Sequence, residues 1–482
     1  MKNLRTFFND WEEQFPNEVC RIKRNVSVKH EMTALAVQLE KQQLFPILVF
    51  ENPVSPSGQK LNYPVVTNLL ASRKRCAAAL DIPLEEVAQG YFNLMSKKIP
   101  PDMVSGEGAP VKEVILRGDQ LDLNTLPVLS HHEGTSGQRF TAAMVTTVDP
   151  ETGIDNCSLQ SASIRGKDKL VWSNGPVSHN SLNMKAWWDK GQDCPVAFWI
   201  GHHPAASLGG QQRLSHPESH YPGIGGIIGE PLKLVPTETF GKDLMVPADA
   251  EIVIEGYAPR EVFESGHYAG DHAKTMIPIG PVPSVKVTCI THRRNAFYHD
   301  IAVSHADNLV MGGFALEAAV YDACKKVCPS VKNVHFPLSG FCRRIAYVQV
   351  SGATAGFPKA IISAALPVDN RLKYVFVVDE DVDIFDDREV LLALVNRAQL
   401  DRDMVLLSGM PDTIIDPVSV RVGDGYVTSK AGFDLTLPPS PGAGLPRQFE
   451  ETVKIPAELE KNMRVEDYLG RDALSKLERE PQ

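Results

Sequence analysis

Hydrophobic residues in the first part of the chain follow both helical and strand-like patterns. Their spacing predicts helices over residues 4–14 and 31–42, and the short apolar run at 45–50, bounded by Pro46 and Asn52, predicts a strand. We therefore expect residues 1–110 to form an N-terminal α/β segment.

Residues 111–311 contain many short segments in which apolar and polar residues alternate, separated by Gly, Pro and Asp. This pattern predicts short strands and only slightly favours a closed or split β-barrel over a β-sandwich. The expected strands lie within residues 112–128, 140–148, 156–164, 169–172, 196–200, 251–256 and 285–292.

The last third of the chain begins with a helical pattern over residues 312–328 that stops before Pro329, so we expect a linker helix there. Residues 329–437 then alternate strand-like and helix-like segments, which predicts βαβ units in a C-terminal α/β domain. Residues 438–482 are Pro-rich and then charged, which predicts an extended arm and an exposed helix. The expected strands are 331–336, 344–350 and 374–378, and the expected helices are 356–365 and 390–396.

The composition mainly excludes certain classes of protein and of binding partner. The 482 residues are 43% hydrophobic and 22% charged, which is typical of a chain that folds on its own. Lys and Arg number 49 and Asp and Glu 59, giving a net charge of −10, so no basic excess favours nucleic acid or an anionic membrane as a partner. Because no apolar run approaches the ~18 residues of a membrane span and the start lacks a signal-peptide pattern, we expect a cytoplasmic protein.

Several familiar site patterns are incomplete. The eight cysteines include no C-x-x-C pair, which argues against a zinc ribbon or a disulfide framework. The glycine run over residues 223–229 departs from the G-x-G-x-x-G spacing of dinucleotide sites and follows no strand, so we expect a tight turn. Asp379, Asp381 and Asp383 begin like a calcium loop, but Ile384 stands where such a loop needs glycine.

Two acidic residues, Glu264 and Asp271, flank a glycine-containing segment. Gly266 and Gly270 permit a loop that brings both carboxyl groups together, as is needed when one acid must stay protonated beside a reacting carbon. A solvent-exposed acidic turn explains the same pattern, and the residues alone leave both interpretations open.

Short motifs along nearly the whole chain resemble the UbiD-like family of decarboxylases, in its aromatic acid branch. Each motif is weak alone, but their shared order and spacing identify the chain as similar to this family. The motifs are PVVTN at 64–68, LP at 126–127, DPETG at 149–153 followed by Asn156, VPA at 246–248, EIVIEG at 251–256, GDH at 270–272 and SKAGFD at 429–434.

The resemblance implies a fold, a cofactor and a reaction. The fold is α+β, with a split β-barrel that binds the flavin, a linker helix and a C-terminal α/β dimerisation domain. The cofactor is prenylated flavin mononucleotide (prenylated FMN), supplied by a flavin prenyltransferase. The reaction is reversible non-oxidative decarboxylation of an aromatic or heteroaromatic carboxylic acid through a covalent adduct with the flavin, in which the cofactor serves as electron sink. A homodimer, or a larger homo-oligomer such as a hexamer, is expected.

The family's functional residues transfer position by position. Asp271 falls on the acid that returns the proton, and Glu264 is its expected companion because the family position is Gly266 here. The family arginine pairs with these acids and stabilises flavin or carboxylate charge, and it stands five residues after Asn156, where this chain has Ser161. The residues at cofactor-binding positions are Asn156, Ser161, His179 and Lys430.

If residues 156–165 form one strand, Arg165 lies on the same face as Ser161 but roughly 13 Å away, too far to replace the missing arginine. We therefore expect an altered substrate head group or a weakened activity. We also expect that Ser161→Arg would not be a simple gain, because the pocket has adapted to the absence of a guanidinium there.

The family also holds a divalent ion at the cofactor phosphate, with a monovalent ion beside it. Asn156 and His179 match two ligand positions, but Lys233 stands where the third, a glutamate, is expected. Glu238, or Glu230, would take that place after a small local shift. The resemblance thus implies Mn, Mg or Fe, with K+ nearby, and an oxygen-rich ligand set suits Mn or Mg.

The departures at Ser161 and Lys233 leave alternatives open. One is a decarboxylase whose aromatic acid is carried as a coenzyme A thioester. Another is a flavin-binding accessory subunit that keeps the fold without the activity. A flavin oxidoreductase is a third, and it would need NAD(P)H.

Overall fold

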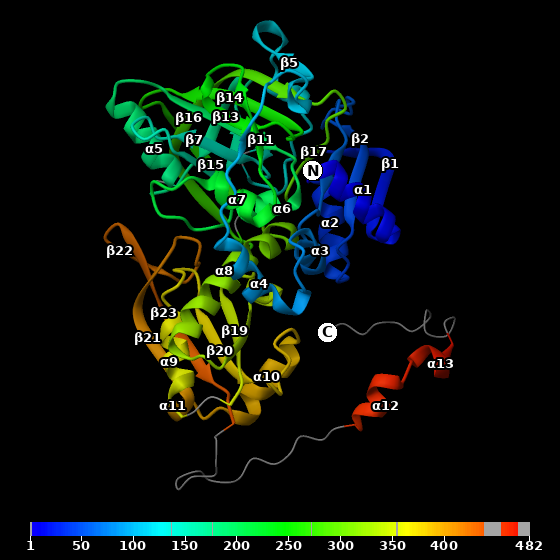
Figure 1. The fold of residues 1–482 in the computed structure, drawn as a ribbon, viewed down its shortest axis with the longest axis vertical. Coiled ribbons are helices and arrows are strands. Elements are labelled where there is room, and N and C mark those ends of the chain that lie inside the picture. Colours follow the sequence, from blue (N-terminus) through cyan, green and yellow to red (C-terminus); the bar gives the residue numbers. More distant parts are fainter. Residues whose placement is uncertain are drawn as a thin grey trace. The chain divides into compact units, whose positions relative to one another are not determined.

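The computed structural model describes residues 2–135, 137–175, 177–270, 272–352, 355–437 and 455–470. The chain divides into two units, Met1–Thr436 and Leu437–Gln482, and each is described by itself. Figure 1 shows the first unit with an N-terminal part in blue, a sheet-rich central part in cyan and green, and a C-terminal part in yellow and orange. This mixture of helices and sheets confirms the predicted α+β class.

The N-terminal sheet takes its last strand from far along the chain. Its order is β1-β2-β3-β17, and β17 pairs in parallel with β3. Both predicted helices and the predicted strand are confirmed as α1, α2 and β2. The central part of the chain therefore completes this sheet. The elements are α1 (Leu4–Gln14), β1 (Val19–Ser27), α2 (Glu31–Lys41), β2 (Ile47–Val54), β3 (Val65–Thr67), α3 (Arg73–Ala79), α4 (Val87–Met95) and β17 (Tyr298–His299).

The central sheet curls so that its two ends approach each other at one residue. Strands are hydrogen-bonded in the order β6-β9-β10-β16-β14-β11-β7-β8, with β15 and β5 also paired to β16. β8 stands at one end of this order and β9 near the other, yet only Gln160 separates them in sequence. Because neighbouring strands lie about 4.8 Å apart, one residue could not connect the ends of a flat sheet. The sheet is therefore curled, as the predicted split barrel requires.

The central part contains the following elements. The strands of the curled sheet are β5 (Val114–Leu116), β6 (Arg139–Phe140), β7 (Met144–Val148), β8 (Asp155–Leu159), β9 (Ser161–Ile164), β10 (Lys169–Ser173), β11 (Cys194–Ile200), β14 (Ile252–Ala258), β15 (Phe263–Gly270) and β16 (Met276–His292). A small sheet has the order β13-β12-β4 and consists of β4 (Asp102–Met103), β12 (Lys233–Thr237) and β13 (Gly241–Pro247). The helices are α5 (His179–Asp189), α6 (Pro204–Gly209) and α7 (His220–Ile228).

The segment 112–128 is not the long strand that its alternating pattern predicts. Only β5 is a strand, and much of the remainder forms 3-10 turns. Gly118 has a φ of +54°, and the Asp122 side chain caps the next turn, so the backbone changes direction at both points. Leu123 and Leu126 are nevertheless buried. The apolar spacing of this segment reflects contacts with the core and not a continuous strand.

The glycine run over residues 223–229 is helical, which corrects the predicted tight turn. It lies in α7, and Gly229 ends the helix with a φ of +85°. Close packing requires the glycines inside the helix, because a Cβ on Gly226 would lie 2.0 Å from the carbonyl oxygen of Lys97. The glycines thus allow the backbone of α7 to pass close to the segment after α4.

The predicted linker helix is α8 (Ala306–Val327), which begins earlier than the predicted residue 312. Asp307 anchors its first turn by accepting the backbone N–H groups of Asn68 and Leu70 at 2.8 and 2.7 Å. Its buried face, including Leu309 and Phe314, belongs to a core cluster that extends from α3 and α4 to β20. One helix therefore contributes to the packing of the N-terminal, central and C-terminal parts.

The C-terminal sheet has the order β18-β19-β20-β23-β21, with β22 paired to β23. β19, β20 and β23 run parallel, and the predicted strands and helices of this region are confirmed. The elements are β18 (Val331–His335), β19 (Ile345–Val350), α9 (Phe357–Ala365), β20 (Tyr374–Asp379), α10 (Asp387–Arg397), α11 (Leu400–Asp403), β21 (Met404–Asp412), β22 (Val420–Val422) and β23 (Gly425–Asp434).

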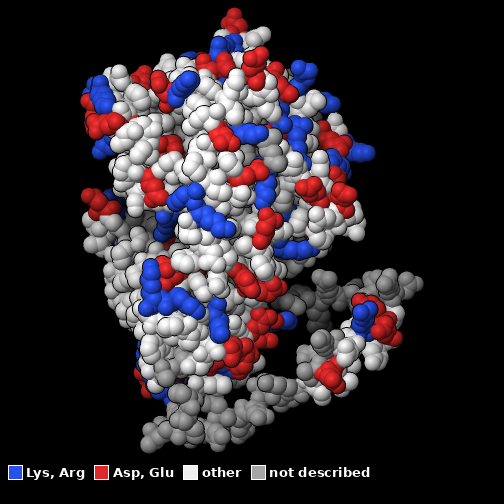
Figure 2. All heavy atoms as spheres, viewed as in Figure 1, with Lys and Arg blue, Asp and Glu red and all other residues white. Residues whose placement is uncertain are grey.

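In the second unit, two short helices lie within residues 455–470, namely α12 (Ala457–Asn462) and α13 (Val465–Leu469). The predicted arm at 438–454 lies outside the described residues. Across the described ranges, no helix is long and apolar enough to cross a membrane. On the face in Figure 2, basic and acidic residues are interspersed over the first unit. The domain boundaries predicted from the sequence stay a prediction.

Candidate active site

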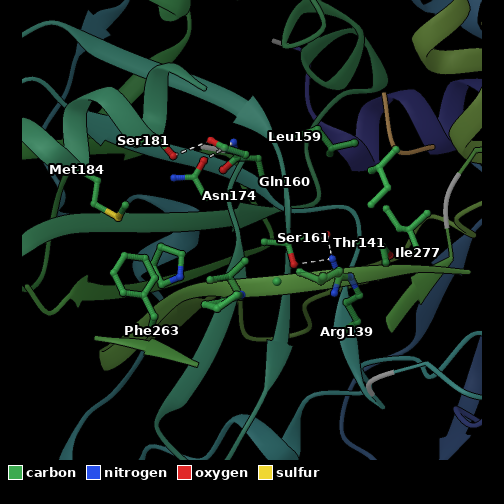
Figure 3. A pocket seen from close by; sticks show the side chains of 18 of the residues that line it. Arg139, Thr141, Leu159, Gln160, Ser161, Asn174, Ser181, Met184, Phe263 and Ile277 are labelled. Atoms are coloured by element: carbon green, nitrogen blue, oxygen red, sulfur yellow. Dashed lines mark hydrogen bonds between the residues drawn. The ribbon is translucent and has the colours of Figure 1, made fainter. Parts of the chain in front are cut away.

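A cavity of about 1100 Å³ lies between the curled sheet, α5, α8 and the β15–β16 hairpin. Ligand sites for one small molecule commonly occupy ~300–1,000 Å³, so this cavity can hold a large ligand together with a smaller one. Strands β6, β9 and β10 and the residues next to them contribute polar side chains, α5 contributes both polar and apolar side chains, and the hairpin contributes mainly apolar ones (Figure 3). The apolar lining includes Met184, Trp188, Phe263, Ile277, Ile279 and Val282.

One polar wall consists of side-chain amides, which we call the amide network (Asn156, Gln160, Asn174 and Asn180). The Oδ1 of Asn180 accepts the Nδ2 of Asn156 at 2.7 Å, and the Nδ2 of Asn180 donates to Gln160 Oε1 at 3.2 Å. Gln160 in turn donates to Asn174 Oδ1 at 3.2 Å and accepts the indole N–H of Trp172 at 2.8 Å. Gln160 and Asn174 line the cavity, while Asn156 and Asn180 are buried. The network fixes neutral polar groups at the cavity wall.

Helix α5 supplies part of this network because it turns polar residues toward the interior. Ser178 caps the helix by accepting the backbone N–H of Ser181. Asn180 and Asn183, three residues apart, lie on one side of the helix, and both bond to Thr147 Oγ1, at 2.7 and 3.0 Å. Sequence reasoning missed these amides because it sought titratable groups. Two asparagines at i, i+3 directly after His179 were the available signal.

The second polar wall is the guanidinium cluster (Arg139, Ser161, Ser163 and Ser173). The Nη2 of Arg139 donates to Ser161 Oγ at 2.6 Å and to Ser173 Oγ at 2.8 Å, and its Nη1 donates to Ser163 Oγ at 3.3 Å. The dashed line in Figure 3 marks the contact with Ser161. Arg139, Ser161 and Ser173 line the cavity. Sequence reasoning missed Arg139 because only the pairing of β6 with β9 brings it beside Ser161.

Three histidines lie together where α5 and α7 begin. The ring of His179 is 5.1 Å from that of His216 and 6.3 Å from that of His220, measured between centroids. Burial lowers the pKa of His179, and burial followed by the charge of His179 lowers the pKa of His220 to about 4. The buried Nδ1 of His220 has no hydrogen-bond partner among the described residues. The imidazoles of His179 and His220 are therefore neutral near pH 7 and able to ligate a metal.

Asn156 belongs to the amide network and directly follows Asp155, which contacts the histidine cluster. Its Nδ2 donates to Asn180, which leaves its carbonyl oxygen as the atom that can ligate. Asp155, the preceding residue, accepts the backbone N–H of His220 at 3.0 Å. Within the described ranges, no three His, Cys, Asp or Glu side chains form a group that could hold a metal ion. A metal here would thus need the Asn156 oxygen or a ligand atom in addition to the histidines.

The expected third metal ligand, Glu238, is engaged elsewhere. Its carboxylate pairs with Arg117 at 2.5 Å and Lys112 at 3.2 Å. The alternative, Glu230, accepts the backbone N–H of Lys2 at 2.5 Å. Among the described contacts, neither carboxylate meets His179. His220, which sequence reasoning passed over, takes a place nearer to His179.

The two expected acids have different outcomes. Asp271 lies outside the described residues, but its neighbours Gly270 and His272 both line the cavity. Glu264 is not among the described residues that line it; its Oε1 pairs with Lys169 Nζ at 2.8 Å, and hydrogen bonding to Lys169 lowers its pKa. In strand β15, Glu264 points to the opposite face from its cavity-lining neighbour Phe263. The structure therefore does not bring Glu264 into the cavity.

Lys430 is buried in the C-terminal domain and not at the cavity wall. Its Nζ donates to the backbone carbonyls of Asp369 and Asn370 at 3.2 and 3.0 Å, and burial lowers its pKa. Asp369 also binds the guanidinium of Arg371, which lines the cavity. Lys430 thus stabilises a loop that carries a cavity residue. Arg165 is likewise not among the residues that line the cavity in the described chain, and its Nη1 donates to the Ile164 carbonyl.

Comparison with known sequences gives one consistent family. Three sequence profiles match, described as the N-terminal, the Rift-related and the C-terminal domains of UbiD, a 3-octaprenyl-4-hydroxybenzoate carboxy-lyase, over residues 14–95, 102–306 and 309–435. The anhydromevalonate phosphate decarboxylase of Methanosarcina mazei is 31% identical over 87% of this chain and 94% of its own. The enzyme of that name from Methanothermobacter thermautotrophicus is 29% identical over 78% and 86%.

Solved structures agree with this family. The UbiD-class enzyme HmfF of Pelotomaculum thermopropionicum, in complex with FMN, is 33% identical, with a TM-score of 0.88 over 97% of this chain and 100% of that chain. An evolved dimeric form of HmfF in complex with prenylated FMN is 31% identical, with a TM-score of 0.85 over the same shares. The 3,4-dihydroxybenzoic acid decarboxylase of Klebsiella pneumoniae, 21% identical with a TM-score of 0.83 over 94% and 98%, shares the fold.

Proposed function

The chain belongs to the UbiD family of carboxy-lyases, and from this premise we propose that it catalyses the reversible non-oxidative decarboxylation of an aromatic or heteroaromatic carboxylic acid. The observation that carries this proposal is the cavity itself, which is lined by apolar side chains and by the guanidinium cluster. The apolar wall suits a flat ring, and the guanidinium cluster suits its carboxylate.

We propose prenylated FMN as the cofactor. The size of the cavity and the hydrogen-bonding side chains of Gln160 and Asn174 fit a flavin, and the similar HmfF structures hold FMN and prenylated FMN. When bound, the modified flavin supplies the electron sink for loss of CO2. The chain itself orients the acid against the apolar wall and limits the access of water. A flavin prenyltransferase would supply the cofactor.

Asp271 is proposed to return the proton to the substrate carbon. The support is positional: its neighbours Gly270 and His272 line the cavity. A Cβ on Gly270 would lie 3.1 Å from the Nδ1 of His132, and burial lowers the pKa of His132 to about 4. The segment that carries the acid therefore lies against a neutral histidine. Asp271→Asn keeps the side-chain shape and removes the titrating proton, so it should abolish turnover while flavin binding persists.

We propose that Asn156, His179 and His220 hold a divalent metal, with His220 in place of Glu238. The support is the neutral state of both imidazoles, the unpartnered Nδ1 of His220 among the described residues, and the available oxygen of Asn156. Imidazole ligands favour Fe or Mn over Mg. A K+ ion beside the divalent metal, as the family implies, remains part of this proposal.

A second substrate class has its own support. The curated relatives are named for anhydromevalonate phosphate, which is not aromatic and carries a phosphate. In this chain Arg343 and Arg371 line the same cavity as Arg139, and such additional cations suit a second anionic group. A phosphorylated unsaturated acid is therefore the alternative substrate.

A homodimer or larger homo-oligomer, formed through the C-terminal domain, is also proposed. Helix α10 exposes Leu391, Leu392 and Val395 by 52%, 53% and 79%. Contiguous exposed apolar side chains of this kind are typical of subunit interfaces. Mass photometry should show at least a dimer, and Val395→Glu should shift the population toward monomer.

The decisive experiment is a carbon-exchange assay on protein co-produced with a flavin prenyltransferase. Mass spectrometry of the released small molecule should identify prenylated FMN. Labelled bicarbonate should then exchange into 3,4-dihydroxybenzoic acid, vanillic acid or a related free acid. Exchange confined to anhydromevalonate phosphate, or to a coenzyme A thioester, would replace the proposed substrate class. Flavin binding without exchange in any acid would indicate an accessory subunit.

A further inference from the structure

Three titratable side chains, which we call the imidazole line (Glu40, His305 and His132), lead to the residue before Asp271. Glu40 lies near the end of α2, His305 directly precedes α8, and His132 lies before β6. The Nδ1 of His305 lies 3.5 Å from Glu40 Oε2, and its Nε2 lies 3.4 Å from His132 Nε2. The other ring nitrogen of His132, Nδ1, faces Gly270, because a Cβ on that glycine would lie 3.1 Å from it. The line therefore begins at a carboxylate and ends at an imidazole nitrogen beside the connection between β15 and β16.

Glu40 is ionised and held in place. Its Oε2 accepts the backbone N–H of Ala306 at 2.8 Å, its Oε1 accepts Lys274 Nζ at 3.1 Å, and 14% of its side chain is exposed. Burial raises the pKa of this carboxyl, but hydrogen bonds from His305, Ala306 and Lys274 outweigh burial and lower it to about 2. Because a carboxylate can only accept, the ring nitrogen of His305 that faces it is the one that carries a proton.

The remaining proton positions follow along the line. With one proton on His305, at Nδ1, its Nε2 is bare and accepts the proton of His132 Nε2. Burial, followed by the charges of His131 and His305, lowers the pKa of His132 to about 4, so this ring is neutral near pH 7. A neutral ring protonated at Nε2 has a bare Nδ1. The nitrogen beside Gly270 is therefore an acceptor, and Glu40 determines this from two rings away.

We propose that Glu40 is a positioning residue which, through His305 and His132, keeps the catalytic acid in its protonated form. A bare imidazole nitrogen accepts a hydrogen bond from a protonated carboxyl group but offers nothing to a carboxylate. This inference rests on the proposed function, because it assumes that Asp271 is the acid that returns the proton. It assigns a part in the reaction to a residue of the N-terminal segment.

The reaction needs a protonated acid at the working pH. Loss of CO2 from a carboxylate leaves an electron pair on carbon, and the new C–H bond takes up one proton for each CO2 released. An aspartic acid with the ordinary pKa of roughly 3.9 is almost fully ionised at pH 7 and has no proton to give. A neighbour that stabilises the protonated form raises the pKa of the acid toward neutral pH. The bare nitrogen of His132 is such a neighbour.

A second contact of Glu40 holds the connection that carries the acid. Lys274 lies three residues after Asp271, and its ion pair with Glu40 ties the connection between β15 and β16 to α2. Through Ala306, the same carboxylate also binds the first N–H of α8. One side chain thus fixes both the direction of the hydrogen bonds and the position of the segment at which they end.

The neighbouring titratable groups make contacts of their own. His131 Nδ1 lies 2.8 Å from Thr33 Oγ1, and its Nε2 lies 3.1 Å from Asp300 Oδ1. Because neither contact involves Glu40, a substitution of Glu40 leaves both in place. The other titratable groups on the elements around the line are His30, His131, His272, Lys274 and Asp300.

The test compares Glu40→Leu and Glu40→Gln with the wild type, each co-produced with a flavin prenyltransferase. Glu40→Leu removes the acceptor, whereas Glu40→Gln is the conservative variant, because its amide oxygen can still accept from His305. Glu31→Leu is the matched control: Glu31 lies on the same helix but binds Arg24 and the backbone N–H of Ser27. Circular dichroism checks folding, and flavin content checks the cofactor.

Three measurements follow the protons. Solid-state 15N NMR of histidine-labelled protein shows which ring nitrogens carry a proton, and His132→Phe identifies the signals of His132. An infrared difference spectrum between the wild type and Asp271→Asn shows whether the acid has the C=O stretch of a protonated carboxyl group at pH 7. The dependence of kcat/KM for CO2 release on pH is measured with the preferred acid.

We expect a bare Nδ1 on His132 and a protonated Asp271 in the wild type. In Glu40→Leu both rings are free to change tautomer, so His132 can donate to a carboxylate, and the C=O band should be lost. The alkaline limb of kcat/KM should then move to lower pH by about one unit or more, which is a tenfold loss of activity on that limb. On the acid side kcat/KM should stay within threefold of the wild type. Glu40→Gln should lie between the two, and Glu31→Leu should equal the wild type.

A proton on Nδ1 of His132 in the wild type, or the absence of the C=O band at pH 7, would overturn the proposal. An unchanged pH profile in Glu40→Leu would do so as well, and so would a loss of kcat/KM by one factor at every pH, which would indicate a purely structural role. If Glu40→Leu does not fold, the two spectra of the wild type decide. The proposed function fails separately, if the wild type shows both spectral features but releases CO2 from no acid.

Discussion

The two polar walls of the cavity satisfy their buried groups by different chemistry. In the amide network, Asn180 accepts from Asn156 and donates to Gln160, so these side chains bond to one another with no net charge. In the guanidinium cluster, Arg139 only donates and the serine hydroxyls accept. One wall consists of neutral amides, and the other contains a guanidinium.

From this difference we expect separate roles for the amide network and the guanidinium cluster. Neutral amides hold their shape regardless of which ion binds beside them, which suits the region next to the proposed metal. The guanidinium of Arg139 is a cationic group at the cavity wall, which suits the substrate side. Substitutions in the amide network should therefore affect mainly stability and cofactor retention, and substitutions in the guanidinium cluster mainly substrate binding.

The largest effect is expected from replacing Asn180, the central side chain of the amide network. Asn180→Leu removes the acceptor of Asn156 Nδ2 and of the Thr147 hydroxyl, whereas Gln160 Oε1 keeps the indole N–H of Trp172. Each buried group left without a partner costs about 1–3 kcal/mol, so the free energy of unfolding should fall by roughly 2–5 kcal/mol. Urea unfolding measures this change. Asn124→Leu, at an exposed turn, is the control and should lose less. A loss below about 1 kcal/mol in Asn180→Leu would show that the network is not a unit.

The second prediction concerns the dependence of stability on pH. Neither the amide network nor the guanidinium cluster contains a group that titrates between pH 4 and 7. Buried His202 and His203 gain a proton in this range only on unfolding, because burial, followed by a neighbouring positive charge, lowers their pKa values in the folded protein to about 4 and about 3. In the unfolded chain both bind a proton near pH 6.5, so the unfolded state binds more protons below that value. Stability should therefore decrease as the pH falls from ~6.5 toward 4, by about 1.4 kcal/mol per pH unit for each histidine.

A single variant checks this assignment. His203 Nδ1 accepts the backbone N–H of Ala205 at 3.2 Å, and His203→Asn keeps an acceptor there without a titrating group. Urea unfolding at pH 7, 6 and 5 should show a shallower loss for the variant. If the free energy of unfolding of the variant falls as steeply with pH as that of the wild type, another residue is responsible for the loss of stability in acid.

A smaller effect should follow from displacing α7, which supports the amide network. Asp155 holds the N-terminus of α7 through His220, and Gly226 lets α7 pass close to Lys97. Gly226→Ala forces these backbones apart and should cost about 1–3 kcal/mol, with reduced flavin retention. Gly229→Ala is the control, because a Cβ there meets nothing within 4 Å and only the left-handed backbone is strained. Equal flavin retention in Gly226→Ala and Gly229→Ala would argue against the role of α7 in supporting the amide network.

The smallest effect is expected at Glu264, which pairs with Lys169 near the guanidinium cluster. Lys169 lies on β10, the strand that also carries Ser173, and pairs with Glu264 at a partly exposed site. Glu264→Gln should change the free energy of unfolding by less than about 1 kcal/mol and leave kcat within threefold, because exposed ion pairs contribute little. A tenfold loss of kcat would restore Glu264 to the reaction.

Patterns of hydrophobic residues predicted most elements, since burial on one face is a local property of the sequence. They failed where contacts were decided at a distance: residues 112–128 contact the core through turns, and the glycines of α7 are explained by the backbone at Lys97. The site followed the same rule. Asn156 and Ser161 could be placed because they share a short stretch of chain, but Arg139 and His220 required the pairing of β6 with β9 and the approach of α7 to α5.

The pairing of β17 with β3 has a consequence for how the protein is made. β3 ends at Thr67, but its parallel partner is Tyr298–His299, so a growing chain must extend by more than two hundred residues before the N-terminal sheet can be completed. At ~5–20 residues per second, that wait is on the order of ten seconds or more. During it the edge of β3 is open to other strands. We expect a nascent chain to depend on the ribosome surface or chaperones over this interval, and a gene split after residue 110 to yield an N-terminal fragment that does not fold alone.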